Sequence, residues 1–266
     1  MQVFHTSEDY NSQLSAQNHL VVALNDNACA FAVHNAAGAL QLLGHFGFYV
    51  PLKEDESAFF DFVRSQESLK QKYKTTTVVL QGHKCSLVPA PMYDELYTDS
   101  YLRHMHTLDK DEVAKAVSLL DESVKLVFGV KEYLFYPARS KYYEAIVEPR
   151  AAHYLRKSVR YYPNRLNVFV EKDRIYLVHA NNTQPVFFNS FPNTGIDEAT
   201  YFILNYYQTF GISHQSLPLL LHGNAPQQLA DVLATYAGRA EVLPTKGKSI
   251  DIPEDFEFDF LIDFCH

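Results

Sequence analysis

The chain has 266 residues, of which 47% are hydrophobic and 20% are charged, as is typical of a globular protein long enough for two domains. Its formal net charge of −8 argues against sequence-independent binding of nucleic acid, because such binding requires Lys and Arg side chains to neutralise phosphates. The three cysteines form no CxxC pair, the N-terminus lacks the pattern of a signal peptide, and no stretch approaches the ~20 apolar residues of a membrane span. We therefore expect a cytoplasmic protein with no membrane span.

The first elements in chain order are expected to be three strands. Two apolar runs, which begin near Leu20, flank a short polar turn at residues 25–28, and a third strand starts at Leu40. A helix is expected after Asp55, and the buried strand that follows it ends at Gly82. This order predicts a β-β-β-α-β unit.

The same order of elements returns in the second half of the chain. Two strands begin near Leu166 around a polar turn at residues 171–174, a third strand begins at Pro185, and a helix comes next. A buried strand then ends at Gly223, which we expect to match Gly82. With an offset of 146 residues (166 − 20), these apolar positions coincide: Leu20 with Leu166, Val22 with Val168, Leu24 with Val170, and Phe31 with Leu177.

The C-terminal stretch has a strict period of two. Apolar residues alternate with mostly acidic ones, which predicts a strand with one buried face. We favour pairing of this strand with the protein's own sheet, where the acidic residues would protect an edge; pairing with a neighbouring molecule is the alternative. The apolar positions are Phe256, Phe258, Phe260, Ile262 and Phe264.

Five elements in the same order in both halves indicate a duplicated unit, with expected domains 1–162 and 163–266. Three meandering strands followed by a helix and a further strand begin the ribonuclease H-like unit. Two such units side by side make the actin-like fold shared by actin, sugar kinases and Hsp70-type ATPases. We therefore predict an α/β protein with the duplicated, two-domain ribonuclease H-like fold of the actin-like ATPases.

Four segments carry a resemblance to a known family. PVFFNSF, DEATYFILNYYQTFGI and LLLHGN, together with SLVPAPMYDELY from Ser86, resemble the uncharacterised bacterial domain-of-unknown-function family 3822 over nearly the whole chain. The resemblance implies an actin-like fold and no assigned activity. More distantly, the segment from Val124 to Lys157, with VEP at residues 147–149, is similar to actin-like scaffold proteins of type IV pilus and type II secretion machines.

The resemblance also implies where a nucleotide would bind. Active actin-like ATPases hold the phosphates with two Asp-x-Gly turns, one in each domain, in which glycine lets backbone N–H groups approach the phosphates. A third element with paired glycines contacts the adenosine. The counterparts in this chain are Asn25, Asp26 and Asn27 in the first turn, Glu171, Lys172, Asp173 and Arg174 in the second, and His222, Gly223 and Asn224 in the third.

Neither phosphate turn contains glycine, and the third element has one glycine instead of a pair. Side chains in a phosphate cradle oppose binding sterically, and the Glu171 carboxylate repels phosphate. We therefore predict a degenerate nucleotide site, no catalytic residues, and no nucleotide or metal cofactor. The alternative is a divergent ATP-binding enzyme or nucleotide sensor in which Lys172 or Arg174 replaces the backbone contacts.

Other residue clusters have structural explanations that we favour. His104 and His106 offer metal-binding atoms but point apart on a helix, and His83 with Cys85 lacks a second pair. Nuclease chemistry needs a carboxylate on the first strand, whereas Asp26 lies beyond that strand. A basic and aromatic cluster could bind a nucleic-acid strand, but a solvated helix face explains it as well. Its members are Arg150, Tyr154, Arg156, Lys157, Arg160, Tyr161, Tyr162 and Arg165.

These observations favour a catalytically inactive actin-like protein that acts as a protein-binding or scaffold module. A fold by itself licenses no activity, so this interpretation rests on the altered turns. The sequence does not identify the protein partner, and a homo-oligomer is as admissible as a complex with another protein.

Overall fold

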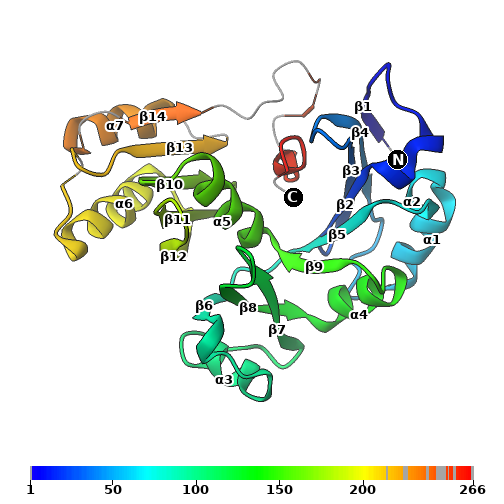
Figure 1. The fold of residues 1–266 in the computed structure, drawn as a ribbon, viewed down its shortest axis with the longest axis horizontal. Coiled ribbons are helices and arrows are strands. Elements are labelled where there is room, and N and C mark those ends of the chain that lie inside the picture. Colours follow the sequence, from blue (N-terminus) through cyan, green and yellow to red (C-terminus); the bar gives the residue numbers. More distant parts are fainter. Residues whose placement is uncertain are drawn as a thin grey trace. The chain divides into compact units, whose positions relative to one another are not determined.

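The computed structural model of the chain describes residues 2–213, 215–223, 227–237, 240–243, 250, 252–253 and 256–264. The chain forms two compact units (Figure 1). The first contains the residues up to Ala152 and the end of the chain from Phe260, and the second contains most of the residues from His153 to Asp259. The expected domains 1–162 and 163–266 stay a prediction.

The main sheet of the first unit is built from β1 (Gln2–Thr6), β2 (His19–Leu24), β3 (Ala28–His34), β4 (Leu40–Gly47), β5 (Thr75–Leu80) and β9 (Ile146–Pro149). Within the described residues their order across the sheet is β1-β4-β3-β2-β5-β9. The central strands β2 and β3 are buried almost throughout, because their near-continuous apolar runs present no polar face to solvent. The main part of this unit also contains η1 (Ser12–Gln17), α1 (Ser57–Ser65), α2 (Glu67–Lys70) and α4 (Glu132–Lys141).

A smaller sheet lies in the chain between β5 and β9. It consists of β6 (Cys85–Pro89), β7 (Glu112–Leu119) and β8 (Val124–Lys131), in the order β6-β8-β7 over the described residues. The segment from β6 to β7 forms η2 (Ala90–Met92), η3 (Glu95–Tyr97) and α3 (Thr98–Arg103). Val88, Leu102, Leu108 and Val127 form a separate small core, so α3 packs on this sheet.

The sheet of the second unit is built from β10 (Arg165–Val170), β11 (Arg174–Ala180), β12 (Pro185–Pro192), β13 (Leu219–Gly223) and β14 (Ala240–Leu243). Its order in the described part of the chain is β12-β11-β10-β13-β14. Its helices are α6 (Ile196–Phe210), α7 (Gln227–Ala237) and the part of α5 (Arg150–Tyr161) from His153 onward. Residues of α6 and α7 share a core with alternate residues of β10, β11 and β13, whereas Tyr154 of α5 stacks on Phe169 of β10 at 4.1 Å between ring centroids. The helices therefore cover both faces of the sheet.

The structure confirms the duplicated topology. In the first unit β2 pairs antiparallel with β3, β3 pairs antiparallel with β4, and β2 pairs parallel with β5. In the second unit β10, β11, β12 and β13 repeat these pairings in the same order. Leu20 lies opposite Val33 and Leu166 lies opposite His179, which is the same register at the offset of 146 (166 − 20, 179 − 33). Even the bulge recurs at the same place, after Val33 and after His179.

The expected match of Gly82 with Gly223 is wrong. In the parallel pairs, Leu80 lies opposite Leu24, and Gly223 lies opposite Val170. Because Leu24 and Val170 are equivalent positions, Gly223 corresponds to Leu80, and Gly82 comes two residues later. The two glycines also have different conformations: Gly223 has a φ of 80°, which favours glycine, whereas Gly82 has no positive φ.

The expected C-terminal strand is also wrong for the residues that are described. Residues 257–263 form turns and the short 3-10 helix η4 (Asp259–Leu261). Phe256, Phe258, Phe260, Ile262 and Phe264 are all buried, as the alternation predicted, but the intervening Leu261 is buried as well. The backbone of Leu261 and Ile262 makes hydrogen bonds to the buried His34 of β3, and Arg150 lies 4.5 Å over the Phe260 ring. The burial of Leu261 breaks the strict period of two on which the predicted strand rested.

Candidate functional site

The first turn, between β2 and β3, satisfies its own backbone donors. The carboxamide oxygen of Asn25 accepts hydrogen bonds from the N–H of Asn27 at 3.0 Å and from the N–H of Ala28 at 2.7 Å. The N–H of Asn25 donates to the carbonyl of Ala28 at 3.0 Å. An Asn at the start of a tight turn often bonds backbone donors in this way. The N–H groups of Asn25, Asn27 and Ala28 are thus already bonded within the turn.

The outer part of this turn is bonded to other elements of the first unit. Tyr133, at the start of α4, donates its hydroxyl hydrogen to the Asp26 carboxylate at 2.8 Å. Burial and this hydrogen bond raise the pKa of Tyr133, so the hydroxyl stays a donor. The carbonyls of Asp26 and Asn27 accept from the N–H groups of Leu52 and Phe48 at 2.8 and 2.7 Å. The aspartate that remains in the turn is therefore held by a tyrosine.

The second turn, between β10 and β11, is bonded in a similar manner within the second unit. Tyr154 of α5 donates its hydroxyl hydrogen to the Glu171 carboxylate at 2.5 Å. The carbonyl of Glu171 accepts from the side-chain amide of Asn193 at 2.7 Å, and the N–H of Asn193 donates to the carbonyl of Asp173 at 2.8 Å. The carboxylate that would face phosphate is thus oriented by a buried tyrosine.

The two basic residues of the second turn differ in their surroundings. Arg174 is half-buried and donates to Ser190 of β12, with 3.3 Å between Nη2 and Oγ. Lys172 is exposed. Of the two residues proposed to replace backbone contacts to a nucleotide, only Lys172 keeps its side chain in solvent.

The third element begins with a tightly packed histidine. His222 is buried, its Nε2 lies 2.9 Å from the carboxamide oxygen of Asn167, and its ring stacks on Phe169 at 4.3 Å. Burial, assisted by the charge of Lys157, lowers the pKa of His222 to about 3. A Cβ on Gly223 would lie 3.1 Å from the carbonyl of Val170. The glycine therefore allows the end of β13 to approach β10 closely. Asn224 lies outside the described residues.

The other candidate residues mostly have structural contacts. His106 bonds to the carbonyl of Cys85 at 3.0 Å, and no group of three metal-binding side chains occurs among the residues that the structure describes. Arg165 pairs with Glu241 at 3.0 Å. On α5, Arg156 and Lys157 are half-buried and Arg160 is exposed, so the helix presents a narrower basic face than the sequence suggested.

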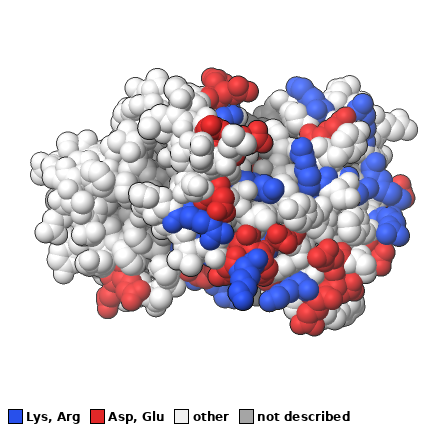
Figure 2. All heavy atoms as spheres, turned by 90° about the horizontal axis from the view of Figure 1, so that it is seen from below, with Lys and Arg blue, Asp and Glu red and all other residues white. Residues whose placement is uncertain are grey.

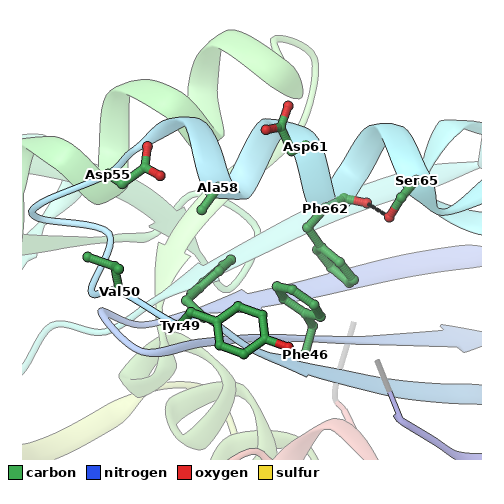
Figure 3. A pocket seen from close by; sticks show the side chains of 9 residues that line it. Phe46, Tyr49, Val50, Asp55, Ala58, Asp61, Phe62 and Ser65 are labelled. Carbon is green, nitrogen blue, oxygen red and sulfur yellow. Dashed lines mark hydrogen bonds between the residues drawn. The ribbon is translucent and has the colours of Figure 1, made fainter.

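A pocket of about 370 Å³ lies in the first unit between α1 and the end of β4 (Figure 3). Phe46 stacks on Phe62 with 4.5 Å between ring centroids, and Phe48 meets Phe46 edge-on at 5.5 Å. Tyr49 is fully exposed. The acidic residues of the lining, Asp55 and Asp61, come from the helix side. Sequence analysis missed this pocket, because its aromatic residues follow the pattern of an ordinary core.

The carboxylates of the pocket are only partly engaged by the protein. Just before α1, Asp55 accepts from the N–H of Ser57 at 3.0 Å and from the Ser57 hydroxyl at 2.6 Å. Asp61 lies 3.7 Å from Arg64 in a pair that is exposed on both sides and therefore weak. The arrangement suits an apolar or aromatic group with a positive charge beside it.

The family model described as protein of unknown function (DUF3822) matches residues 7–236. This chain belongs to the DUF3822 family. A comparison with curated proteins gives no match. No helix in the described part of the chain has the length and apolar character that a membrane span needs.

Several solved structures are similar to this DUF3822 protein, and one of them is described as having an actin-like ATPase fold. One is a protein from Bacteroides thetaiotaomicron with an actin-like ATPase fold and unknown function, with a TM-score of 0.75, 17% identity, and coverage of 88% of this chain and 93% of that one. Another is the PilM–PilN type IV pilus biogenesis complex, with a TM-score of 0.56, 12% identity, and coverage of 92% and 96%. The cytoplasmic domain of EpsL from the Vibrio cholerae type II secretion system is similar at a TM-score of 0.45, with 13% identity and coverage of 86% of each chain. The predicted actin-like fold and the resemblance to the family are confirmed.

Proposed function

We propose that this DUF3822 protein is a catalytically inactive actin-like protein that acts by binding a protein partner. The observation that supports this proposal most directly is the bonding of the first turn. The Asn25 carboxamide occupies the N–H groups of Asn27 and Ala28, and a phosphate would have to displace it. In the second turn Glu171 adds a negative charge to the counterpart of a phosphate-binding turn, and this charge would repel phosphate. Both changes oppose nucleotide binding and leave the fold intact.

A protein with this fold is found in the PilM–PilN type IV pilus biogenesis complex, so the fold is compatible with a role in protein assembly. The pocket beneath α1 is the surface that we assign to the partner. Its aromatic floor suits an apolar side chain, and Asp55 and Asp61 suit a basic residue next to it. We therefore expect a partner segment in which an aromatic or aliphatic residue neighbours Lys or Arg.

Tagged full-length protein should recover a stoichiometric partner from its native cytoplasm, and Tyr49→Ala should weaken that complex at least about tenfold. Tyr49 is 100% exposed, so its removal should not disturb folding. The matched control is Tyr143→Ala, which changes the same residue type in the same unit at 71% exposure and lies outside the pocket. A complex that survives Tyr49→Ala places the partner elsewhere. Recovery of no partner, together with a tightly bound small molecule, would refute the proposal.

The exposed Lys172 supports one alternative, a nucleotide sensor, which a thermal shift assay distinguishes. Millimolar ATP with Mg²⁺ should leave the Tm of the wild-type protein unchanged. A ligand that binds only the native state at 100 times its Kd adds about 2.7 kcal/mol to the free energy of unfolding, so binding would be visible. A rise in Tm that is abolished by Lys172→Ala would establish the nucleotide sensor instead.

A further inference from the structure

The second unit contains a long stretch of sequence that is almost free of charge. Residues 175–230 include Asp197 and Glu198 but no Lys or Arg, whereas 20% of the whole chain is charged. In Figure 2 the part of the surface on the left, which belongs to this unit, is largely white, while the first unit carries both signs of charge. Surfaces that are depleted of charge and rich in aromatic residues are typical of protein interfaces.

The strand β12 forms an edge of the sheet within this stretch. Its sequence, PVFFNSFP, has no charged residue, and no strand in the described part of the chain pairs with its outer side. Proteins usually protect such edges with Lys, inward-pointing charges or proline. Here prolines occur only at the two ends, Pro185 and Pro192, so residues 186–191 lack this protection.

The hydrogen-bond pattern shows which backbone groups of β12 face outward. Just beyond the strand ends, the N–H of Asn193, which follows β12, donates to the carbonyl of Asp173, which precedes β11, at 2.8 Å. Antiparallel ladders alternate between bonded and non-bonded pairs, so the backbone groups of Phe188 and Ser190 point away from β11. The N–H of Ser190 is bonded at 2.8 Å to the side chain of the adjacent Asn189, and its carbonyl receives a long bond of 3.5 Å from Arg174. These local side-chain bonds can be exchanged for backbone bonds to another strand.

Apolar side chains flank this edge. Val186 of β12 is 56% exposed, and the half-exposed Phe210 of α6 lies 5.4 Å from the Phe187 ring. An added strand would thus gain apolar contacts as well as backbone hydrogen bonds.

We propose that two copies of the chain dimerise through β12, antiparallel and about a two-fold axis at Asn189. Phe188 of one copy then lies opposite Ser190 of the other, and the two five-stranded sheets become continuous. Pro185 and Pro192 limit the intermolecular hydrogen bonds to the residues between them. Once two β12 strands have paired, neither has a free edge left, so the assembly stops at two copies. This proposal does not depend on the proposed function, because an actin-like protein that binds nucleotide could pair in the same way.

Charge supports a second copy as the occupant. Two chains with a net charge of −8 each repel one another, and the charge-depleted face is where this repulsion is smallest. A neutral edge needs no partner of opposite charge, and an antiparallel edge is complementary to its own copy.

Sedimentation equilibrium of the full chain tests the dimer. The wild-type protein should be dimeric at micromolar concentration, and Val186→Lys should raise the dimer Kd at least about tenfold, because it replaces an apolar contact beside Pro192 of the other copy with a charge that dimerisation would desolvate. The matched control is Val3→Lys on β1, the edge strand of the other unit, where Val3 is 47% exposed. The control should stay dimeric.

Amide hydrogen exchange of the wild-type protein needs no substitution. On dilution from the dimer to the monomer, the N–H groups of Phe188 and Ser190 should lose protection, while those of the buried strand β10 should keep it. A monomeric wild-type protein at high micromolar concentration, or a dimer equally tight in Val186→Lys, would overturn the proposal. So would binding of a different protein's strand to a chain that remains monomeric by itself.

Discussion

Lowering the pH from about 7 to about 4 should reduce the free energy of unfolding by several kcal/mol, because two histidines are buried as neutral rings. Burial lowers the pKa of His222 to about 3 and the pKa of His34 to about 4. In the unfolded chain both rings titrate near ~6.5. Between these values the unfolded state binds more protons than the native state. The contribution of these two histidines to the free energy of unfolding is therefore fully present above about pH 6.5, and it decreases as the pH falls through this window.

The surroundings of the two rings determine how far this effect extends. The charge of Lys157 lowers the pKa of His222 further, whereas hydrogen bonds that the His34 ring donates to the backbone of Leu261 and Ile262 partly oppose the effect of burial at His34. Within this window, each histidine is expected to lower the free energy of unfolding by about 1.4 kcal/mol for each unit that the pH falls. The loss from each histidine is then about 3 kcal/mol at pH 4.

Urea unfolding at a series of pH values measures this loss. Replacing both rings, by His34→Gln and His222→Gln, should flatten the pH dependence, since glutamine can keep a hydrogen bond without titrating. An unchanged slope in the double variant would mean that acidic groups, not these histidines, cause the acid sensitivity.

The repeated strands were predictable because burial is encoded locally. Val22 and Val168 lie in runs that are apolar at almost every position, as central strands covered on both faces require, and the structure gives both runs the same register. The short polar turns after Leu24 and Val170 were predictable for the same reason. The first strand, Gln2–Thr6, was not predicted, because as an edge strand it is largely exposed and has no continuous apolar run.

The details of the candidate site depend on contacts that sequence patterns do not reveal. The bond of the Asn25 side chain to its own turn is local, and the tendency of Asn to begin turns could have predicted it. The bond from Tyr133 to Asp26 joins residues 107 positions apart, and no local pattern indicates it. The C-terminal segment shows the opposite problem: alternation correctly predicted that Phe256 and Phe264 are buried but not the backbone that buries them.

Gly82 has a structural role that differs from the one that the sequence repeat suggested. The sequence placed it after the fourth strand as a repeat of Gly223, but the strand register does not support this match. Its actual environment is a close backbone approach. A Cβ at residue 82 would lie 2.6 Å from the carbonyl oxygen of Gly129 in β8, and the N–H of Gly129 bonds to the carbonyl of Lys84 at 2.8 Å. The glycine therefore lets the segment after β5 pack on the smaller sheet.

Gly82→Ala should accordingly lower the free energy of unfolding by about 3 kcal/mol, because the added methyl group overlaps a backbone atom that cannot rotate away. The matched control is Gly47→Ala in the same unit, where an added Cβ meets nothing within 4 Å and the φ is not positive. The control should change stability by less than about 1 kcal/mol, with either sign, since the removed flexibility of glycine offsets small losses. Urea unfolding of the two variants measures the difference. If Gly82→Ala is as stable as Gly47→Ala, the segment after β5 can move away from β8 at little cost, and the contact does not hold the smaller sheet in place.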